Sequence, residues 1–365
     1  MRNLSSHSCY RLDQLAHLGL PSQIFIPALL QELHHEISSF SNTFFWQDDK
    51  GKLCNIFDEI AQTKSIQNFI TSISSIKEDK YLYTTKWVSS LAAPTTSLEN
   101  FGKCPFVAEF YKTILLPMGY YNTCFIPIFN PKTNVRLGIL MVHRTKYDPD
   151  FSQEEIERLQ YISSIIFFGM SQPKQESICT TDGWEQGLLI IDHDGKIQHA
   201  CAMGEKLLSL ASSSFFDSSV HHRLDDIHVF DGIDKLIKAL LERHQHQQQI
   251  KDPTLTQSNA WGDFKLRAFL IKDKIGNRMP RIGLNIRWQE PFVLKLFHRI
   301  KTLGLTPRQE TVGLLYAAGD PHQNISAKLN ISVFTVKEHV KNITDKLNIR
   351  SRADLIALLL CDNSS

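Results

Sequence analysis

The segment from residue 305 to 360 carries so many helix start and stop signals that it can fold only as short helices joined by tight turns. The run TPRQ at 306–309 combines an N-cap threonine, a proline at the first helical position and a glutamine able to close a capping box. Gly319 then supplies a C-terminal stop, and Ser332 is a good N-cap for a later helix. The spacing therefore predicts four helices, with a turn at Asn330-Ile331-Ser332 before the third.

The third of these helices has two distinct faces. One is apolar at helical spacing and predicts a buried face: Val336, Val340, Ile343 and Leu347. The other is aromatic and charged: Phe334, Lys337, Glu338 and Lys341. Two helices with a tight turn, the second polar in front and apolar behind, describe a helix-turn-helix. On geometry alone, an ordinary helical subdomain with a solvated basic face fits equally well.

The residues themselves add a family resemblance. The motifs LTPRQ, NISxxTVKxHV and KLNIRSR run without a gap from Leu305 to Arg352 and resemble the LuxR/FixJ (GerE) class of bacterial helix-turn-helix domains. The resemblance implies that the third helix reads DNA, that the position of Thr335 holds a backbone phosphate, and that the fourth helix contributes to dimerisation. Within the motif Gln323 to Asn342, the expected DNA-binding residues are Ser332, Val333, Phe334, Thr335, Lys337, Glu338, Lys341 and Asn342.

Four positions depart from the family pattern. Thr311 and Asn324 stand where the family usually or often has Glu, and Gly313 replaces a large apolar residue of the first helix. Glu338 places an acid on the groove-facing stripe, where phosphate repels it unless it accepts a hydrogen bond from a cytosine amino group. Phe334 either touches a thymine methyl or packs on its own domain.

The charge of this end is modest. From residue 301 onward, eight Lys or Arg stand against six acids, a net of +2. Because non-specific attraction to DNA scales with the phosphates a protein neutralises, one such domain binds weakly. We therefore expect a homodimer on paired promoter half-sites of double-stranded DNA.

Composition places the chain among globular proteins of two or three domains, because it has 365 residues and 42% hydrophobic content. Its seven cysteines are scattered without a CxxC pair, which favours reduced thiols and a cytoplasmic location and disfavours a metal site. The apolar runs 18–30 and 159–170 are too short and too interrupted to span a membrane.

Ahead of the helical end, the chain predicts an α+β sensor domain over residues 1–174, beginning with a helical extension. Hairpins are expected at 44–56 and 121–143, followed by an amphipathic helix from Phe151 to Phe167. The run from Leu116 through GILMVHR to FSQEEIERLQ resembles GAF domains that precede LuxR-type ends. A polar linker is expected near 175–182.

A second α+β domain is expected over residues 183–290. Its first hairpin, 187–200, contains LLIIDHDG, which also suits the acidic strand end of a receiver domain. A receiver needs a helix after that strand, whereas here another strand follows, so the acids are read as turn residues. The hairpin and the helix starting at Glu205 resemble a PAS domain, with later strands at 261–268 and 282–288. A connecting helix, 293–301, leads into the helix-turn-helix domain at 298–363.

No catalytic, cofactor or metal site emerges from the remaining residues. His34-His35, His221-His222 and the loop-like run HQHQQQ at 244–249 lack metal-ligand spacing. Five aromatics of the first domain are either a ligand cavity or, as we favour, core: Trp46, Tyr83, Trp87, Phe101 and Phe106. The sequence thus predicts a non-enzymatic DNA-binding transcriptional regulator, tuned by its N-terminal domains or by an unidentified small-molecule signal. The alternative is an interaction protein whose degenerate helix-turn-helix antagonises another regulator.

Overall fold

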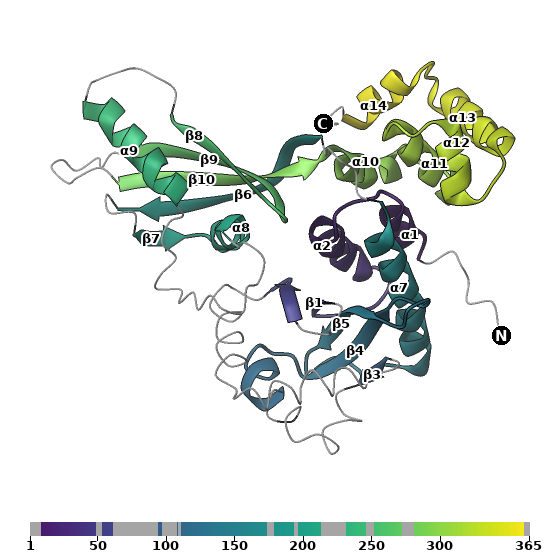
Figure 1. The fold of residues 1–365 in the computed structure, drawn as a ribbon, viewed down its shortest axis with the longest axis horizontal. Coiled ribbons are helices and arrows are strands. Elements are labelled where there is room, and N and C mark those ends of the chain that lie inside the picture. The colour runs from purple at the N-terminus through teal and green to yellow at the C-terminus, as the bar shows by residue number, and fades with distance from the viewer. Residues whose placement is uncertain are drawn as a thin grey trace. The chain divides into compact units, whose positions relative to one another are not determined.

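The computed structural model describes residues 9–48, 53–60, 94–96, 108, 111–173, 179–192, 196–212, 231–245, 252–271 and 281–360. The chain divides into two compact units, which we name the helical unit and the sheet unit (Figure 1). The helical unit comprises Met1–Glu32, Phe168–Thr181 and Glu290–Ser365. The sheet unit comprises Leu33–Phe167 and Asp182–Gln289. Both units are therefore assembled from segments far apart in the sequence.

The first sheet of the sheet unit is five-stranded, in the order β2-β1-β5-β4-β3. Its strands are β1 (Ser41–Gln47), β2 (Leu53–Asp58), β3 (Thr95–Thr96), β4 (Asn122–Phe129) and β5 (Arg136–Arg144). Both predicted hairpins are present as antiparallel pairs, β1 with β2 and β4 with β5. The predicted amphipathic helix is α7 (Gln153–Ser171), and it begins in a capping box between Ser152 and Glu155.

The second sheet repeats the same arrangement, in the order β7-β6-β10-β9-β8. Its strands are β6 (Thr180–Ile191), β7 (Ile197–Ala200), β8 (Thr254–Asn259), β9 (Gly262–Ile271) and β10 (Arg281–Pro291). The element after β6 is an antiparallel strand, with Leu189 opposite Ala200, so the receiver alternative is wrong. Because β6 begins at Thr180, the last part of the predicted linker at 175–182 is strand. Counted within each sheet, the strand order is the same.

Several elements of the sheet unit lack a clear sequence signal. They are the short strand β3, the π-helical turn η1 (Tyr111–Leu115) and α9 (Asp231–Gln245). Both α9 and α8 (Ala202–Ser212) pack on β8 and β9. Since α9 runs to Gln245, the first two residues of the run predicted as a loop at 244–249 are helical. Predictions at Tyr83, Trp87, Phe101, Phe106 and His221-His222 lie outside the described residues.

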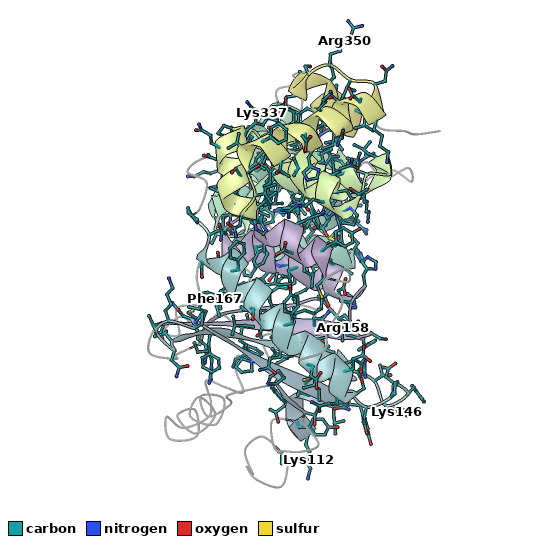
Figure 2. All side chains as sticks on the ribbon, turned by 90° about the vertical axis from the view of Figure 1, so that its right-hand side faces the viewer. Lys112, Lys146, Arg158, Phe167, Lys337 and Arg350 are labelled. Carbon is teal, nitrogen blue, oxygen red and sulfur yellow. The ribbon has the colours of Figure 1, made fainter. Side chains whose placement is uncertain are left out.

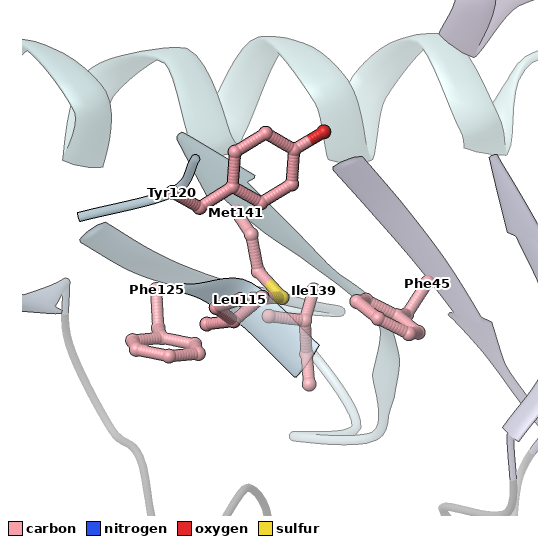
Figure 3. Close-up of a cluster of buried hydrophobic side chains, with 6 residues drawn as sticks. All are labelled: Phe45, Leu115, Tyr120, Phe125, Ile139 and Met141. Carbon is pink, nitrogen blue, oxygen red and sulfur yellow. The ribbon is translucent and has the colours of Figure 1, made fainter. Parts of the chain in front are cut away.

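The core of the first sheet includes a cluster on one of its faces, drawn in Figure 3. Its members are Phe45, Leu115, Tyr120, Phe125, Ile139 and Met141. Trp46 belongs to a second buried group, with its ring 4.8 Å from that of Phe44 and 5.7 Å from that of Trp261. Of the five aromatics that could have lined a ligand cavity, Trp46 lies in the described residues, and it belongs to the core.

One end of the cluster's face is polar and centred on His143, which is fully buried on β5. Its Nε2 lies 2.8 Å from the Thr43 hydroxyl and its Nδ1 lies 2.9 Å from the Thr123 hydroxyl. Tyr120 stacks on the imidazole at 3.9 Å and donates its hydroxyl to the Asp58 carboxylate at 2.8 Å. Because burial penalises the charged imidazolium, it lowers the pKa of His143 to about 3.

The helical unit combines both ends of the chain. Its helices are α1 (Tyr10–Ala16), α2 (Ser22–Leu33), α10 (Phe292–Ile300), η3 (Lys301–Leu303), α11 (Pro307–Ala317), α12 (His322–Leu329), α13 (Val333–Leu347) and α14 (Arg352–Leu360). From sequence, the first two helices are expected to extend the first sheet domain. Almost all of α1 and α2 instead belongs to the compact unit that contains the C-terminal helices. Among the described residues, no helix is long and apolar enough to cross a membrane.

Two buried side chains of α1 make the contact to the C-terminal helices. The Arg11 guanidinium lies 3.6 Å above the Phe297 ring of α10 and donates to the Phe297 carbonyl at 3.1 Å. It also pairs with the Glu32 carboxylate of α2 at 3.3 Å. One turn further along α1, Gln14 Nε2 donates to the Thr311 hydroxyl at 3.1 Å and to the Pro307 carbonyl at 3.2 Å. Polar contacts over nearly 300 residues of separation thus hold α1 against α10 and α11.

Candidate nucleic-acid interface

The helix-turn-helix of the helical unit starts as the sequence predicts. Thr306 Oγ1 accepts the Gln309 N–H at 3.3 Å, and Gln309 Oε1 accepts the Thr306 N–H at 3.0 Å, which closes the capping box of α11. Gly319 follows α11 with a φ of +108°, a conformation that side-chain-bearing residues rarely adopt. Both ends of α11 are therefore set by local chemistry.

The turn between α12 and α13 is fixed by hydrogen bonds. Asn330 ends α12 in the left-handed conformation, with a φ of 50°, and Ser326 Oγ donates to the Ile331 carbonyl at 2.6 Å. Ser332 then caps α13, because its Oγ accepts the Thr335 N–H at 3.0 Å. The two hydroxyls of Ser332 and Thr335 lie 2.8 Å apart. These bonds confirm the predicted N-cap and hold the first turn of α13 in place.

The inner face of α13 is narrower than the sequence predicts. Val336 and Ile343 are buried, whereas Val340 and Leu347 are only partly covered. The prediction of four equivalent buried positions is therefore half wrong. α13 packs against α11 and α12, and the buried Ile343 side chain lies beside Gly313 of α11. A short helix in a small unit buries only a stripe of its surface.

The outer face of α13 presents most of the predicted site residues to solvent. Ser332, Phe334, Lys337, Glu338, Lys341 and Asn342 are exposed, and Val333 and Thr335 are half-buried. Phe334, Lys337, Glu338 and Lys341 share one stripe because they lie at i, i+3, i+4 and i+7. Figure 2 labels Lys337 on the C-terminal helices and shows the Arg350 side chain extending away from the ribbon.

The cations of this domain fall into two groups. Four are engaged in intramolecular bonds: Arg308 to the Leu329 carbonyl at 3.2 Å, Lys328 to Asp320 at 2.8 Å, Lys346 to the Gly304 carbonyl at 2.6 Å, and Arg352 to the Gly319 carbonyl at 3.1 Å. By contrast, within the described part of the chain Lys337 and Lys341 make no ion pair or hydrogen bond through their side chains. On α13 itself, the free charges therefore lie on the outer stripe, whereas Lys301 and Arg350 are exposed outside this helix.

The link into α14 also has an electrostatic role. Asp354 accepts the backbone N–H groups of Arg350 and Ser351, each at 2.9 Å. The Arg350 N–H holds the pKa of the Asp354 carboxyl below its usual value, so the carboxylate stays charged at the N-terminus of α14. The Arg352 guanidinium lies 4.5 Å above the Tyr316 ring of α11. The sequence did not predict this contact, because no local pattern places Arg352 on an inward face.

One departure from the family pattern has a structural partner, and a second is accommodated without strain. Thr311 donates its hydroxyl to the Pro307 carbonyl at 2.9 Å and accepts from Gln14, so a small hydroxyl at this position fits beneath α1. At Gly313, an added Cβ would lie 3.4 Å from the Ile343 side chain, an ordinary contact distance. The glycine therefore leaves α11 folded and its neighbours packed. Burial raises the pKa of Glu310, which faces the same contact with Gln14.

Comparison with known proteins agrees with this geometry. Residues 303–359 match the family model of the bacterial regulatory proteins of the luxR family. The HTH-type transcriptional regulators MalT of Vibrio campbellii and of Vibrio parahaemolyticus are each 32% identical to this chain over 94 residues. That match covers 24% of this chain and 10% of each relative, so the chain spans about a tenth of their length. The C-terminal helices are thus a LuxR-family helix-turn-helix domain.

Similarity to solved structures is weak. A phage VqmA–DPO complex aligns with 48% of this chain and 83% of its own at 17% identity, with a TM-score of 0.20. The sensor region of a sensor histidine kinase aligns with 68% of this chain and 84% of its own at 9% identity, with a TM-score of 0.21. Scores this low do not indicate a shared overall fold.

Proposed function

We propose that this protein is a sequence-specific DNA-binding transcriptional regulator that reads a promoter half-site with the outer stripe of α13. The observation that carries this proposal is the division of cations in the helix-turn-helix domain. Lys337 and Lys341 are exposed and unpaired among the described residues, while neighbouring cations bond to their own chain. Lysines in this position neutralise phosphates or donate to base edges when a helix enters the major groove.

The first turn of α13 supports the same mode of binding. Its N-terminal backbone N–H groups and the Thr335 hydroxyl, which pairs with the hydroxyl of Ser332, lie on the turn that precedes Lys337. A helix N-terminus attracts phosphate because its N–H groups and dipole favour negative charge. The proposed roles are therefore positioning by Ser332 and Thr335 at the backbone, and charge and base contacts by Lys337 and Lys341. Asn342, which follows Lys341 in α13, is also exposed.

Replacing Lys337 with alanine should weaken duplex binding about tenfold, because one cation is lost from the groove-facing stripe. The measurement is an electrophoretic mobility shift of the full chain on genomic fragments at low salt, followed by a salt titration. Lys301→Ala is the matched control: it removes the same charge at an exposed position outside α13 and should retain at least half of the binding.

The alternative function predicts a different result in that assay. A degenerate helix-turn-helix that antagonises another regulator retards no duplex at any salt, and Lys337→Ala changes nothing. Glu338 and Gly313 are the remaining residues in favour of this alternative, because the contact from Gln14 explains only Thr311. Retardation of duplex by the unmodified chain would exclude it.

We extend the proposal to the sheet unit, which we assign as the sensory part. Its two sheets repeat one strand order, as expected of tandem GAF-like and PAS-like domains. The protein would act in the cytoplasm as a homodimer, because two domains of low net charge need paired half-sites for useful affinity. Sedimentation equilibrium tests the dimer. Thermal melting of the sheet unit with candidate metabolites tests the sensor, since a bound ligand raises its Tm.

A further inference from the structure

Phe334 is the exception on the charged stripe of α13. Its side chain is 70% exposed, although it lies in the first turn of a helix that buries Val336 and Ile343. An exposed benzyl group forgoes the transfer free energy that its burial would provide, which is on the order of that of several CH₂ groups. The alternative that Phe334 packs on its own domain is excluded by this exposure.

The position of Phe334 restricts what can cover it. It shares a stripe with Lys337 and Lys341, three and seven residues further along the same rigid helix. An occupant that covers the ring therefore meets two unpaired cations as well, which favours a polyanion over an apolar protein surface. The floor of the DNA major groove offers both features, since phosphates line its edges and thymine presents an apolar C5-methyl group.

We propose that Phe334 is a specificity-determining residue that contacts a thymine C5-methyl group in the half-site. This inference rests on the proposed function and deepens it by naming a base. The phenyl ring has no donor or acceptor, so it distinguishes thymine from the other bases only through the methyl group. Intercalating side chains act from the minor groove, whereas an α-helix of this kind enters the major groove, so the ring reads an edge.

Glu338 lies one helical turn beyond Phe334 on the same stripe and is exposed. Four residues correspond to about 6 Å along the helix axis, which is about two base steps. A carboxylate in the groove is repelled by phosphate unless it accepts a cytosine amino hydrogen. The half-site therefore contains a thymine with a cytosine within about two steps of it.

The experiment begins with selection of the full chain on a randomised duplex library at low salt. Each thymine of the selected duplex is then replaced in turn by deoxyuridine, which removes the C5-methyl group and nothing else. For the unmodified chain, one replacement per half-site should weaken binding about fourfold, the effect of one buried methyl group. For Phe334→Ala, the same replacement should have no effect. Lys301→Ala should keep the full deoxyuridine sensitivity.

The outcomes are distinguishable. If no duplex is enriched, the proposed function fails and this inference with it. If a duplex is enriched but no thymine responds to deoxyuridine, or Phe334→Ala responds as the unmodified chain does, only the inference fails. Folding of Phe334→Ala is checked by its thermal melting, which should match the unmodified chain because the lost side chain is exposed.

A second arm tests the neighbouring base. Glu338→Gln removes the negative charge and replaces an acceptor with a donor–acceptor pair that suits adenine. Selection with this variant should shift the preferred base from cytosine to adenine at one position and leave the thymine unchanged. If the selected sequence is identical, Glu338 does not select a base. Loss of the thymine preference would contradict the assignment of that base to Phe334.

Discussion

Replacing Arg11 with alanine is expected to destabilise the helical unit by about 3 to 5 kcal/mol, the usual cost of removing one partner from a buried ion pair. Arg11 is 8% exposed, and its partner Glu32 is 7% exposed. Without Arg11, the Glu32 carboxylate loses its cation and the Phe297 carbonyl loses its donor. The stacking on the Phe297 ring is lost as well.

Chemical denaturation with two probes separates the helical unit from the sheet unit. All five tryptophans of the chain fall in the residue ranges of the sheet unit, so their fluorescence reports that unit. Far-UV circular dichroism at the helix band follows mainly the helical unit, with a smaller contribution from α7, α8 and α9 of the sheet unit. For Arg11→Ala, the midpoint of the helix signal should fall while the tryptophan midpoint stays in place.

Arg350→Ala is the matched control for Arg11. It removes the same side chain from the same unit, but at an exposed position, and should change the free energy of unfolding by less than about 0.5 kcal/mol. Glu32→Gln combined with Arg11→Met should recover part of the loss, because no unpaired buried charge remains. Equal destabilisation by Arg11→Ala and Arg350→Ala would contradict the buried-contact explanation.

The contribution of His143 by itself should destabilise the sheet unit by about 3 kcal/mol between pH 7 and pH 4. The pKa of this imidazole is about 3 in the folded protein, and its ordinary value is 6.5. Below pH 6.5 the unfolded chain therefore binds a proton that the folded chain does not. Stability is complete above pH 6.5 and falls with pH until about pH 3.

Tryptophan fluorescence during denaturation at pH 7, 5.5 and 4 provides the measurement. Acid also destabilises the sheet unit through other groups. Hydrogen bonds from Thr145 lower the pKa of Asp148, so the folded protein loses this contribution when the carboxylate is protonated. His143→Gln is the control, since glutamine does not titrate but keeps a donor and an acceptor for Thr43 and Thr123. The difference between the two proteins should grow by about 1.4 kcal/mol per pH unit below pH 6. Parallel pH profiles would show that His143 is not the cause.

The features that sequence predicted well are local. The caps at Ser152, Thr306 and Ser332 were identified because the cap and its partner lie three residues apart. The β4–β5 and β6–β7 hairpins were identified for the same reason, since turn residues and strand alternation are contiguous. In the candidate interface, the exposed stripe of α13 follows from helical periodicity.

The features that sequence missed depend on residues that meet only after folding. The pairing of Arg11 with Phe297 joins positions 286 residues apart, and nothing local marks either residue. The same holds for His143, whose pKa depends on burial between strands that are distant in the chain. For Thr311, the sequence indicated a departure from a family pattern, and the contact from Gln14 explained it.

The sequence by itself determined that the chain ends in a helix-turn-helix and which residues form its outer stripe, because caps and periodicity act over one or two turns. The tertiary structure alone decided which cations are free, that Phe334 is exposed, and that α1 joins the helical unit. The physical reason is burial: whether a charge is paired or a ring is covered depends on which distant surfaces exclude water from it, and that is not a property of local sequence.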